Sequence, residues 1–183
     1  KGNDCKSEKF QRDFEGKKSI SKHTYEVVRD SFINQGLVFF GGYANLLYSK
    51  YMEKNAQKLL KEIPDFDVLS DDPASSAQIT KERLLDANIK NVKILKSAGI
   101  GEIIAPHYEI NIDGDTVAFI YEPLACHSYN TIKINNKKLK IASIDTMLSF
   151  YLAFLYSNRI YYDSNRILCM AEFLFNVQAK NRL

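Results

Sequence analysis

The chain has 183 residues, 45% of them hydrophobic and 26% charged, with a formal net charge of +3 and a pI near 8.6. This composition excludes a disordered chain, and its mild positive charge permits a polyanionic partner without requiring one. The three cysteines, Cys5, Cys126 and Cys169, are too widely spaced to predict a disulfide framework or a metal site, and the apolar stretches are too short to predict a membrane span.

The first fifth of the chain predicts an arm followed by a helix. Residues 1–18 are charged and show no hydrophobic period, which predicts an N-terminal arm. Ser21 is a good N-cap residue, and apolar side chains then recur near every 3.6 residues to about Gln35. Gly36 follows, where a helix commonly ends.

A short apolar run then leads into two glycines. Residues 37–40 are apolar on both faces, as expected of an inner strand, and Gly41 and Gly42 precede a helical pattern that begins at Tyr43. Glycines allow the main chain to approach a ligand closely, and amides at the start of a helix favour phosphate. A tight turn without a ligand is the alternative.

Asp65 and Asp67 carry the sharpest local signal. They follow Pro64 and flank Phe66, so alternation along a strand places both carboxylates on one face. Aspartate is disfavoured in strands, and a metal-binding pair supplies a reason for two of them, because Mg²⁺ prefers oxygen ligands. A pair of turn-edge aspartates is the alternative.

The rest of the chain alternates between strand and helix patterns. Asp72 is expected to cap a helix rather than to bind metal, because Pro73 fits a first helical turn. Ser128, Tyr129 and Asn130 either line a substrate groove or form a plain loop. The remaining expected elements are a helix to about residue 87, strands at 92–95, 102–112, 116–121 and 137–142, and a helical pair after Ser143.

The order strand, Gly-Gly, helix and Asp-x-Asp resembles the DNA polymerase beta-like nucleotidyltransferases. Three segments, Phe39–Asn45, Pro64–Asp67 and Tyr121–Asn130, look most like the poly(A) polymerase catalytic subunits of large cytoplasmic DNA viruses. The resemblance covers roughly residues 20–180. It implies an α/β (α+β) fold, in which a mixed sheet is flanked by helices and followed by a C-terminal helical pair.

The resemblance also implies an organisation into domains. After the arm at 1–18, residues 19–142 would form the nucleotidyltransferase catalytic domain, and residues 143–183 a helical segment packed on it. Whether the protein forms a homo- or hetero-oligomer stays open. The viral resemblance implies a cytoplasmic location, in an infected cell or a virion, and no membrane partner.

The activity that the resemblance implies is template-independent polynucleotide adenylyl transfer, which adds AMP from ATP to RNA 3′ ends with two Mg²⁺ or Mn²⁺ ions. Asp65 and Asp67 would be catalytic and bind the metal. Gly41, Gly42 and Tyr43 would bind the nucleotide. Many members of the superfamily have Gly-Ser here, whose hydroxyl meets a phosphate; because Tyr43 follows the two glycines, backbone amides would have to serve.

The family usually draws a third carboxylate from the returning strand, and this sequence has no acid at Ala118 or Phe119. Glu122 shares strand parity with Ala118 and is the expected third catalytic residue, while Asp115 is more simply a hairpin former. Two rival functions stay open: a catalytically silent RNA-binding or scaffold subunit of the same fold, and nucleotidyl transfer to a small-molecule or protein acceptor.

The segment after the catalytic sheet packs on the base side of the nucleotide in such polymerases. The resemblance therefore marks Tyr161, Tyr162 and Arg166 as side chains that could stack on a base or meet a phosphate. The same residues equally suit a solvated helix start.

Overall fold

A computed structural model describes residues 20–51, 65–157 and 164–181, so the expected arm at 1–18 and the side chains of Tyr161 and Tyr162 lie outside the described residues. Seven strands form one sheet: β1 (Val38–Phe40), β2 (Phe66–Leu69), β3 (Val92–Ser97), β4 (His107–Ile112), β5 (Asp115–Tyr121), β6 (Tyr129–Ile134) and β7 (Lys137–Ala142). The described helices are α2 (Lys22–Asn34), α3 (Gly41–Tyr48), the 3₁₀ turn η1 (Ser49–Tyr51), α5 (Pro73–Asp86), α6 (Ile144–Ser157) and α7 (Ser164–Asn181). None of these helices is long and apolar enough to cross a membrane.

The sheet is mixed, with β1 and β2 near its centre. Its order is β3-β4-β5-β2-β1-β7-β6. The pairs β1–β7 and β2–β5 are parallel, and the other neighbours are antiparallel. Because β1 and β2 run in opposite directions, the end of β1 and the start of β2 lie at the same edge of the sheet.

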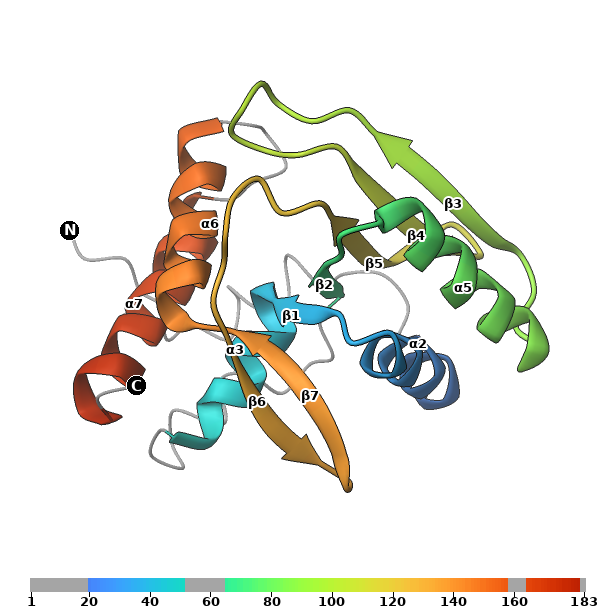
Figure 1. Ribbon diagram of the computed structural model, residues 1–183, viewed down its shortest axis with the longest axis horizontal. Helices are drawn as coiled ribbons and strands as arrows, with labels where there is room; N and C mark the ends of the chain where they lie inside the picture. Colours follow the sequence, from blue (N-terminus) through green and yellow to red (C-terminus); the bar gives the residue numbers. More distant parts are fainter. Residues whose placement is uncertain (1–19, 52–64, 158–163, 182–183) are drawn as a thin grey trace.

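Helices cover both faces of this sheet (Figure 1). Phe39 and Phe66 point to the side of α2, where the Phe66 ring stacks on Tyr25 with centroids 4.4 Å apart. Phe40 points to the other side and stacks on Phe150 of α6 at 4.6 Å. The alternation of Phe39 and Phe40 thus divides the core into two layers, and the expected mixed sheet flanked by helices is confirmed.

The helix starts follow the capping pattern of the sequence. The Ser21 hydroxyl accepts a hydrogen bond from the amide of Thr24 at 3.1 Å. Asp72 accepts one from the amide of Ser75, also at 3.1 Å, and hydrogen bonds from Ser75 hold the pKa of the Asp72 carboxyl below its usual range. Asp72 is therefore a helix cap, as expected.

Strand β6 was not predicted from the sequence. This strand forms a hairpin with β7 through Asn135 and Asn136, whose φ angles are +48° and +64°. Two left-handed residues in a two-residue loop suit the right-handed twist of a hairpin, and asparagine tolerates that conformation well. The alternation of Ile132 and Ile134 before the Asn-Asn pair was the signal that the sequence offered.

Two other details differ from expectation. The strand expected from Glu102 begins only at His107, because residues 100–104 form a turn closed by the amide of Ile100 and the carbonyl of Ile104 at 2.7 Å. Cys169 on α7 is disulfide-bonded, which the spacing of the cysteines did not predict, and Cys126 is a free, exposed thiol.

Candidate active site

The Gly-Gly turn lies directly against the carboxylate of Asp67. Phe40, at the end of β1, pairs with Asp67 in β2, so Gly41 follows immediately beside it. Gly41 has a φ of +65°, and a Cβ atom built on it would lie 2.0 Å from Oδ2 of Asp67. Only glycine fits this position, because any side chain would occupy the space of the carboxylate.

Helix α3 starts at Gly41, and its first turn has no side-chain cap. Phe40 occupies the N-cap position and offers no acceptor. The first amides of a helix have no acceptor within the helix, and the positive end of the helix dipole favours an anion. The start of α3 therefore combines backbone donors with a neighbouring carboxylate, as a site for metal-bound phosphate requires.

Asp65 and Asp67 lie close enough to influence each other. Burial, followed by the negative charge of Asp65, raises the pKa of Asp67 to about 7, against the opposing effect of Arg166. Asp65 reaches solvent, yet loss of solvation is still the main cause that raises its pKa to about 6. Arg166 lowers the pKa of Asp65, and Glu109 and Asp115 raise it. The region thus concentrates negative charge around Asp65.

This electrostatic arrangement fits a divalent cation. Two carboxylates are hard oxygen donors, and a cation would favour the charged forms that burial and mutual repulsion disfavour. Within residues 20–51, 65–157 and 164–181, no group of three histidine, cysteine, aspartate or glutamate side chains is arranged to hold a metal ion. The donor set that the described residues offer is therefore the pair Asp65 and Asp67, completed by oxygens from elsewhere.

Glu122 lies just beyond the end of β5 and is exposed. Ala118 in β5 pairs with Phe66, whereas Asp67 pairs with Phe119. Glu122 was chosen because it points to the same face of β5 as Ala118. Because Ala118 pairs with Phe66, that face is the face of Phe66 and not the face of Asp67. Glu122 as a third catalytic group stays a prediction.

Strand pairing places Glu109 in line with Asp67 across the sheet. Phe119 pairs with Asp67 on one side and with Glu109 of β4 on the other, so these three side chains share a face. The hydroxyl of Thr116 donates a hydrogen bond to Oε1 of Glu109. Sequence reasoning missed Glu109, because only the order of the strands shows that β4 lies two strands from β2.

The C-terminal helices also reach the site. Arg166 of α7 lowers the pKa of both aspartates, so its guanidinium lies within electrostatic reach of the pair. Tyr151 of α6 is buried and donates a hydrogen bond to Oδ1 of Asn45 on α3 at 3.0 Å. Burial, and then the charge of Asp67, raise the pKa of Tyr151. The sequence pattern did not single out Tyr151 for this site.

Comparisons with known proteins identify solved structures with a similar fold, at low sequence identity. No protein family model and no curated protein matches the chain. The crystal structure of the Megavirus polyadenylate synthase matches with a TM-score of 0.66 at 15% identity, over 90% of this chain and 36% of that one. An antigenic nucleotidyltransferase-like protein from Paracoccidioides brasiliensis gives 0.49 at 16% identity, over 85% and 74%.

The chain therefore spans about a third of the length of the Megavirus protein. The similarity extends over most of the sheet and helices described above, and it shows that this chain shares the fold of the Megavirus protein, a mixed sheet flanked by helices as the sequence predicted.

The raised pKa of Asp67 predicts a dependence of stability on pH. The folded protein binds this proton more tightly than the unfolded chain, whose ordinary value is 3.8, so the free energy of unfolding falls as pH rises from about 4 to about 7. We expect Asp67→Asn to raise the free energy of unfolding by about 2 kcal/mol at pH 8 and by much less at pH 4.5. Urea denaturation at both pH values measures the difference.

Asp71→Asn, at an exposed aspartate shortly after β2, is the matched control and should change stability little at either pH. Saturating Mg²⁺ should stabilise the unmodified protein and not Asp67→Asn. A loss of stability in Asp67→Asn that is larger at pH 8 than at pH 4.5 would contradict the account, because it would mean that the charged carboxylate stabilises the fold.

The contact between Gly41 and Asp67 predicts a large effect of one added methyl group. Gly41→Ala introduces both left-handed backbone strain and a collision with the carboxylate. Gly101→Ala introduces the strain alone, because Gly101 has a φ of +51° and a Cβ atom built on it would meet no atom within 4 Å. We expect Gly41→Ala to destabilise the protein by at least about 2 kcal/mol more than Gly101→Ala. Equal losses in urea denaturation would show that the contact is absent.

Proposed function

We propose that the chain transfers AMP from ATP to the 3′ end of RNA in a metal-dependent reaction. The observation that carries the proposal is the approach of the Gly41 backbone, at the start of α3, to the carboxylate of Asp67, with Asp65 beside it. The fold shared with a viral polyadenylate synthase supports this class of reaction. The choice of RNA as acceptor rests on the name of that neighbour and on the sequence resemblance.

In this proposal Asp65 and Asp67 hold Mg²⁺ or Mn²⁺. The metal, when bound, supplies positive charge that favours ionisation of the attacking 3′ hydroxyl and stabilises the leaving pyrophosphate. The backbone amides of Gly41, Gly42 and Tyr43 bind the β- and γ-phosphates, because they form the uncapped first turn of α3. The side chain of Tyr43 is buried among aromatic rings and leaves this task to its amide.

Arg166 is the cationic residue that we assign to the triphosphate. Its charge already acts on Asp65 and Asp67, so phosphate oxygens near these carboxylates would also lie within its reach. A guanidinium can bind phosphate through two parallel hydrogen bonds. The hydrogen bond from Tyr151 to Asn45 holds α3 against α6 and thereby keeps the first turn of α3 in place.

We assign the role of proton acceptor to Glu109 in preference to Glu122. Transfer requires a group that accepts the proton of the attacking hydroxyl, and a carboxylate near the metal pair can do so. Glu109 shares the row of Asp67 through Phe119, and its charge raises the pKa of Asp65. The hydrogen bond from Thr116 holds one of its oxygens and leaves the other available.

A catalytically silent subunit is the second candidate. One observation favours it: the described residues contain no group of three acids arranged to hold a metal, in agreement with the absence of an acid at Ala118 and Phe119. Such a subunit would keep the nucleotide site and bind RNA without extending it.

The proposed function predicts metal-dependent extension of an RNA primer. With oligoadenylate, labelled ATP and Mg²⁺ or Mn²⁺, we expect extension by the unmodified protein and a loss of at least about 100-fold in Asp65→Asn and Asp67→Asn, because each removes a metal ligand. Asp71→Asn is the matched control and should retain the full rate. The assay follows primer length on a denaturing gel.

Each other outcome has a separate meaning. If both Asp65→Asn and Asp67→Asn still extend the primer, the two aspartates are not the catalytic metal ligands. If the unmodified protein does not extend RNA and still binds it, the silent subunit is supported instead. Label transferred to a small molecule or protein, and not to RNA, would identify a different acceptor.

The assignment of Glu109 predicts unequal effects of two isosteric substitutions. We expect Glu109→Gln to lower the extension rate about 100-fold, the usual scale of a lost proton acceptor, and Glu122→Gln to change it less than about twofold. Both variants remove one negative charge and keep the side-chain shape. The opposite order of effects would restore Glu122 as the third catalytic residue.

A further inference from the structure

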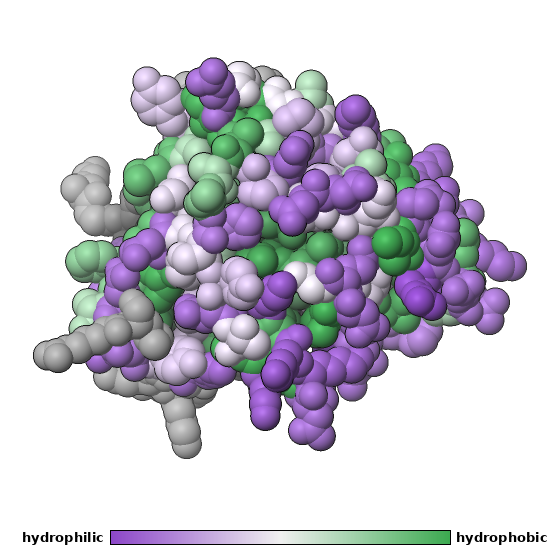
Figure 2. Space-filling model, viewed as in Figure 1, coloured by the Kyte–Doolittle hydropathy of each residue, from purple (hydrophilic) through white to green (hydrophobic). Residues whose placement is uncertain are grey.

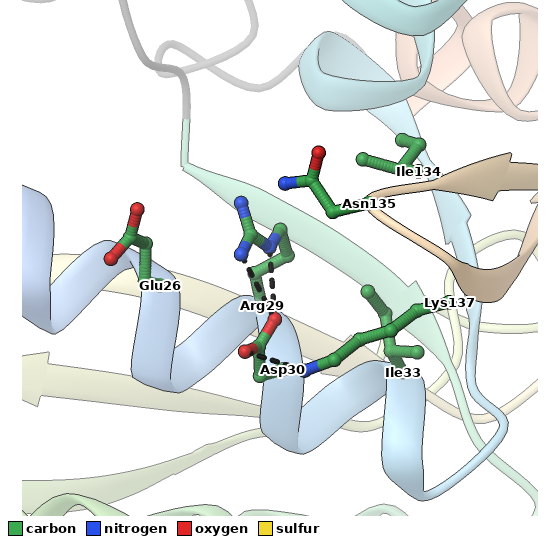
Figure 3. A pocket seen from close by; sticks show the side chains of 7 residues that line it. All are labelled: Glu26, Arg29, Asp30, Ile33, Ile134, Asn135 and Lys137. Atoms are coloured by element: carbon green, nitrogen blue, oxygen red, sulfur yellow. Dashed lines mark hydrogen bonds and ion pairs between the residues drawn. The ribbon is translucent and has the colours of Figure 1, made fainter.

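The β6–β7 hairpin is fastened to α2 by one of its two faces. Asp30 of α2 accepts a hydrogen bond from Nζ of Lys137 at 2.7 Å and one from Nε of Arg29 at 3.0 Å (Figure 3). Burial alone would raise the pKa of Asp30, but the bonds from Lys137 and Arg29 outweigh it and hold the pKa below its usual range. Ile134 and Asn135 line a cavity of about 260 Å³ on this side.

The opposite face of the hairpin is basic, and it is exposed except at the half-buried Lys140. The cross-strand pairs Tyr129↔Ala142, Thr131↔Lys140 and Lys133↔Lys138 alternate with the pairs that face α2. The lower end of the molecule in Figure 2, where the hairpin projects in Figure 1, is correspondingly hydrophilic. We call the set made of the following five side chains the lysine face: Tyr129, Thr131, Lys133, Lys138 and Lys140.

The charges of the lysine face are not balanced within the described part of the chain. Lys133 and Lys138 lie directly opposite each other, and like charges in such a pair destabilise a sheet. Neither they nor Lys140 form an ion pair with a described acid. The ammonium of Lys140 lies 5.0 Å from the ring centroid of Tyr129, whose side chain is 47% exposed. An anionic ligand would offset this repulsion.

The lysine face belongs to the same side of the sheet as the candidate active site. Val38 pairs with Lys140, and Phe40, two residues further along β1, pairs with Asp67. Side chains two residues apart on a strand share a face, so Lys140 and Asp67 point to the same side. Three strand spacings separate β2 from β6, or about 14 Å across the sheet.

The root of the hairpin is also joined to α3. The hydroxyl of Tyr48 donates a hydrogen bond to the carbonyl of Ala142 at 2.7 Å, and the side-chain amide of Asn130 donates one to the Tyr48 oxygen at 3.3 Å. The helix that begins at the Gly-Gly turn therefore also anchors the strand that carries Tyr129. This connection fixes the lysine face relative to the candidate phosphate site.

We propose that the lysine face binds single-stranded RNA upstream of the 3′ end. Lysines spaced along two strands suit a chain of phosphates, and an exposed aromatic ring suits an unpaired base, which can stack on it. In a duplex the bases are already stacked, and Tyr129 would have no role. The direction of the RNA toward Asp67 rests on the proposed function, whereas binding itself does not.

Fluorescence anisotropy of labelled single-stranded oligoadenylate, titrated at several salt concentrations, tests this proposal. We expect the double variant Lys133→Ala/Lys138→Ala to bind at least about 10-fold more weakly, and its slope of log affinity against log salt to decrease by about 1.4, or about 0.7 for each lost phosphate contact. Tyr129→Ala should weaken binding and leave the slope unchanged. Lys93→Ala/Lys96→Ala, on the opposite edge strand, is the control of equal charge.

Equal affinity of the two double variants would overturn the proposal, and so would tighter binding of a duplex than of the single strand. Self-association of Lys133→Ala/Lys138→Ala in sedimentation, with RNA affinity unchanged, would instead assign these lysines to protection of the edge strand. Asp67→Asn separates this inference from the proposed function, because it should bind RNA normally without extending it. If the unmodified protein binds RNA through the lysine face and extends nothing, only the proposed function fails.

Discussion

The backbone of Gly41 lies against the carboxylate of Asp67, and the arrangement of the central sheet follows from this contact. Strands β1 and β2 must be antiparallel neighbours for the end of one to meet the start of the other. The residue after Phe40 must adopt a φ of +65° and carry no side chain. Helix α3 then starts at the carboxylate, and the hydrogen bonds from Tyr151 and Tyr48 connect this helix to α6 and β7.

Packing and electrostatics act in opposite directions at this point. The ring of Phe66 is 1% exposed and is enclosed by Tyr25, Phe32 and Tyr43. A slip of β2 by one residue would move the Phe66 ring out of this cluster and turn the carboxylates into it, so the aromatic cluster fixes the register. The two aspartates are thereby held in surroundings that raise the pKa of both. Such a conflict between local preference and fold is typical of functional sites.

Local patterns predicted the parts of the candidate site that depend on local structure. Alternation placed Asp65 and Asp67 together, and the glycines marked the close approach of the backbone, because both follow from the geometry of one strand and one turn. Glu109 could not be found in this way, since its place beside Phe119 depends on the order of the strands. Glu122 was chosen from the alternation of side chains along β5 alone, without knowledge of how β5 pairs with β2. In the observed register, Phe119 is the residue of β5 that lies opposite Asp67.

The central claim is that the Gly-Gly turn and the two aspartates form one site for metal and triphosphate. A crystal structure of the protein with Mn²⁺ and a non-hydrolysable ATP analogue tests it most directly, because Mn²⁺ is located by its anomalous scattering. The account predicts Mn²⁺ between Asp65 and Asp67, with β- and γ-phosphates at the amides of Gly41 and Gly42. Phosphates bound elsewhere, or Mn²⁺ that contacts neither aspartate, would contradict it.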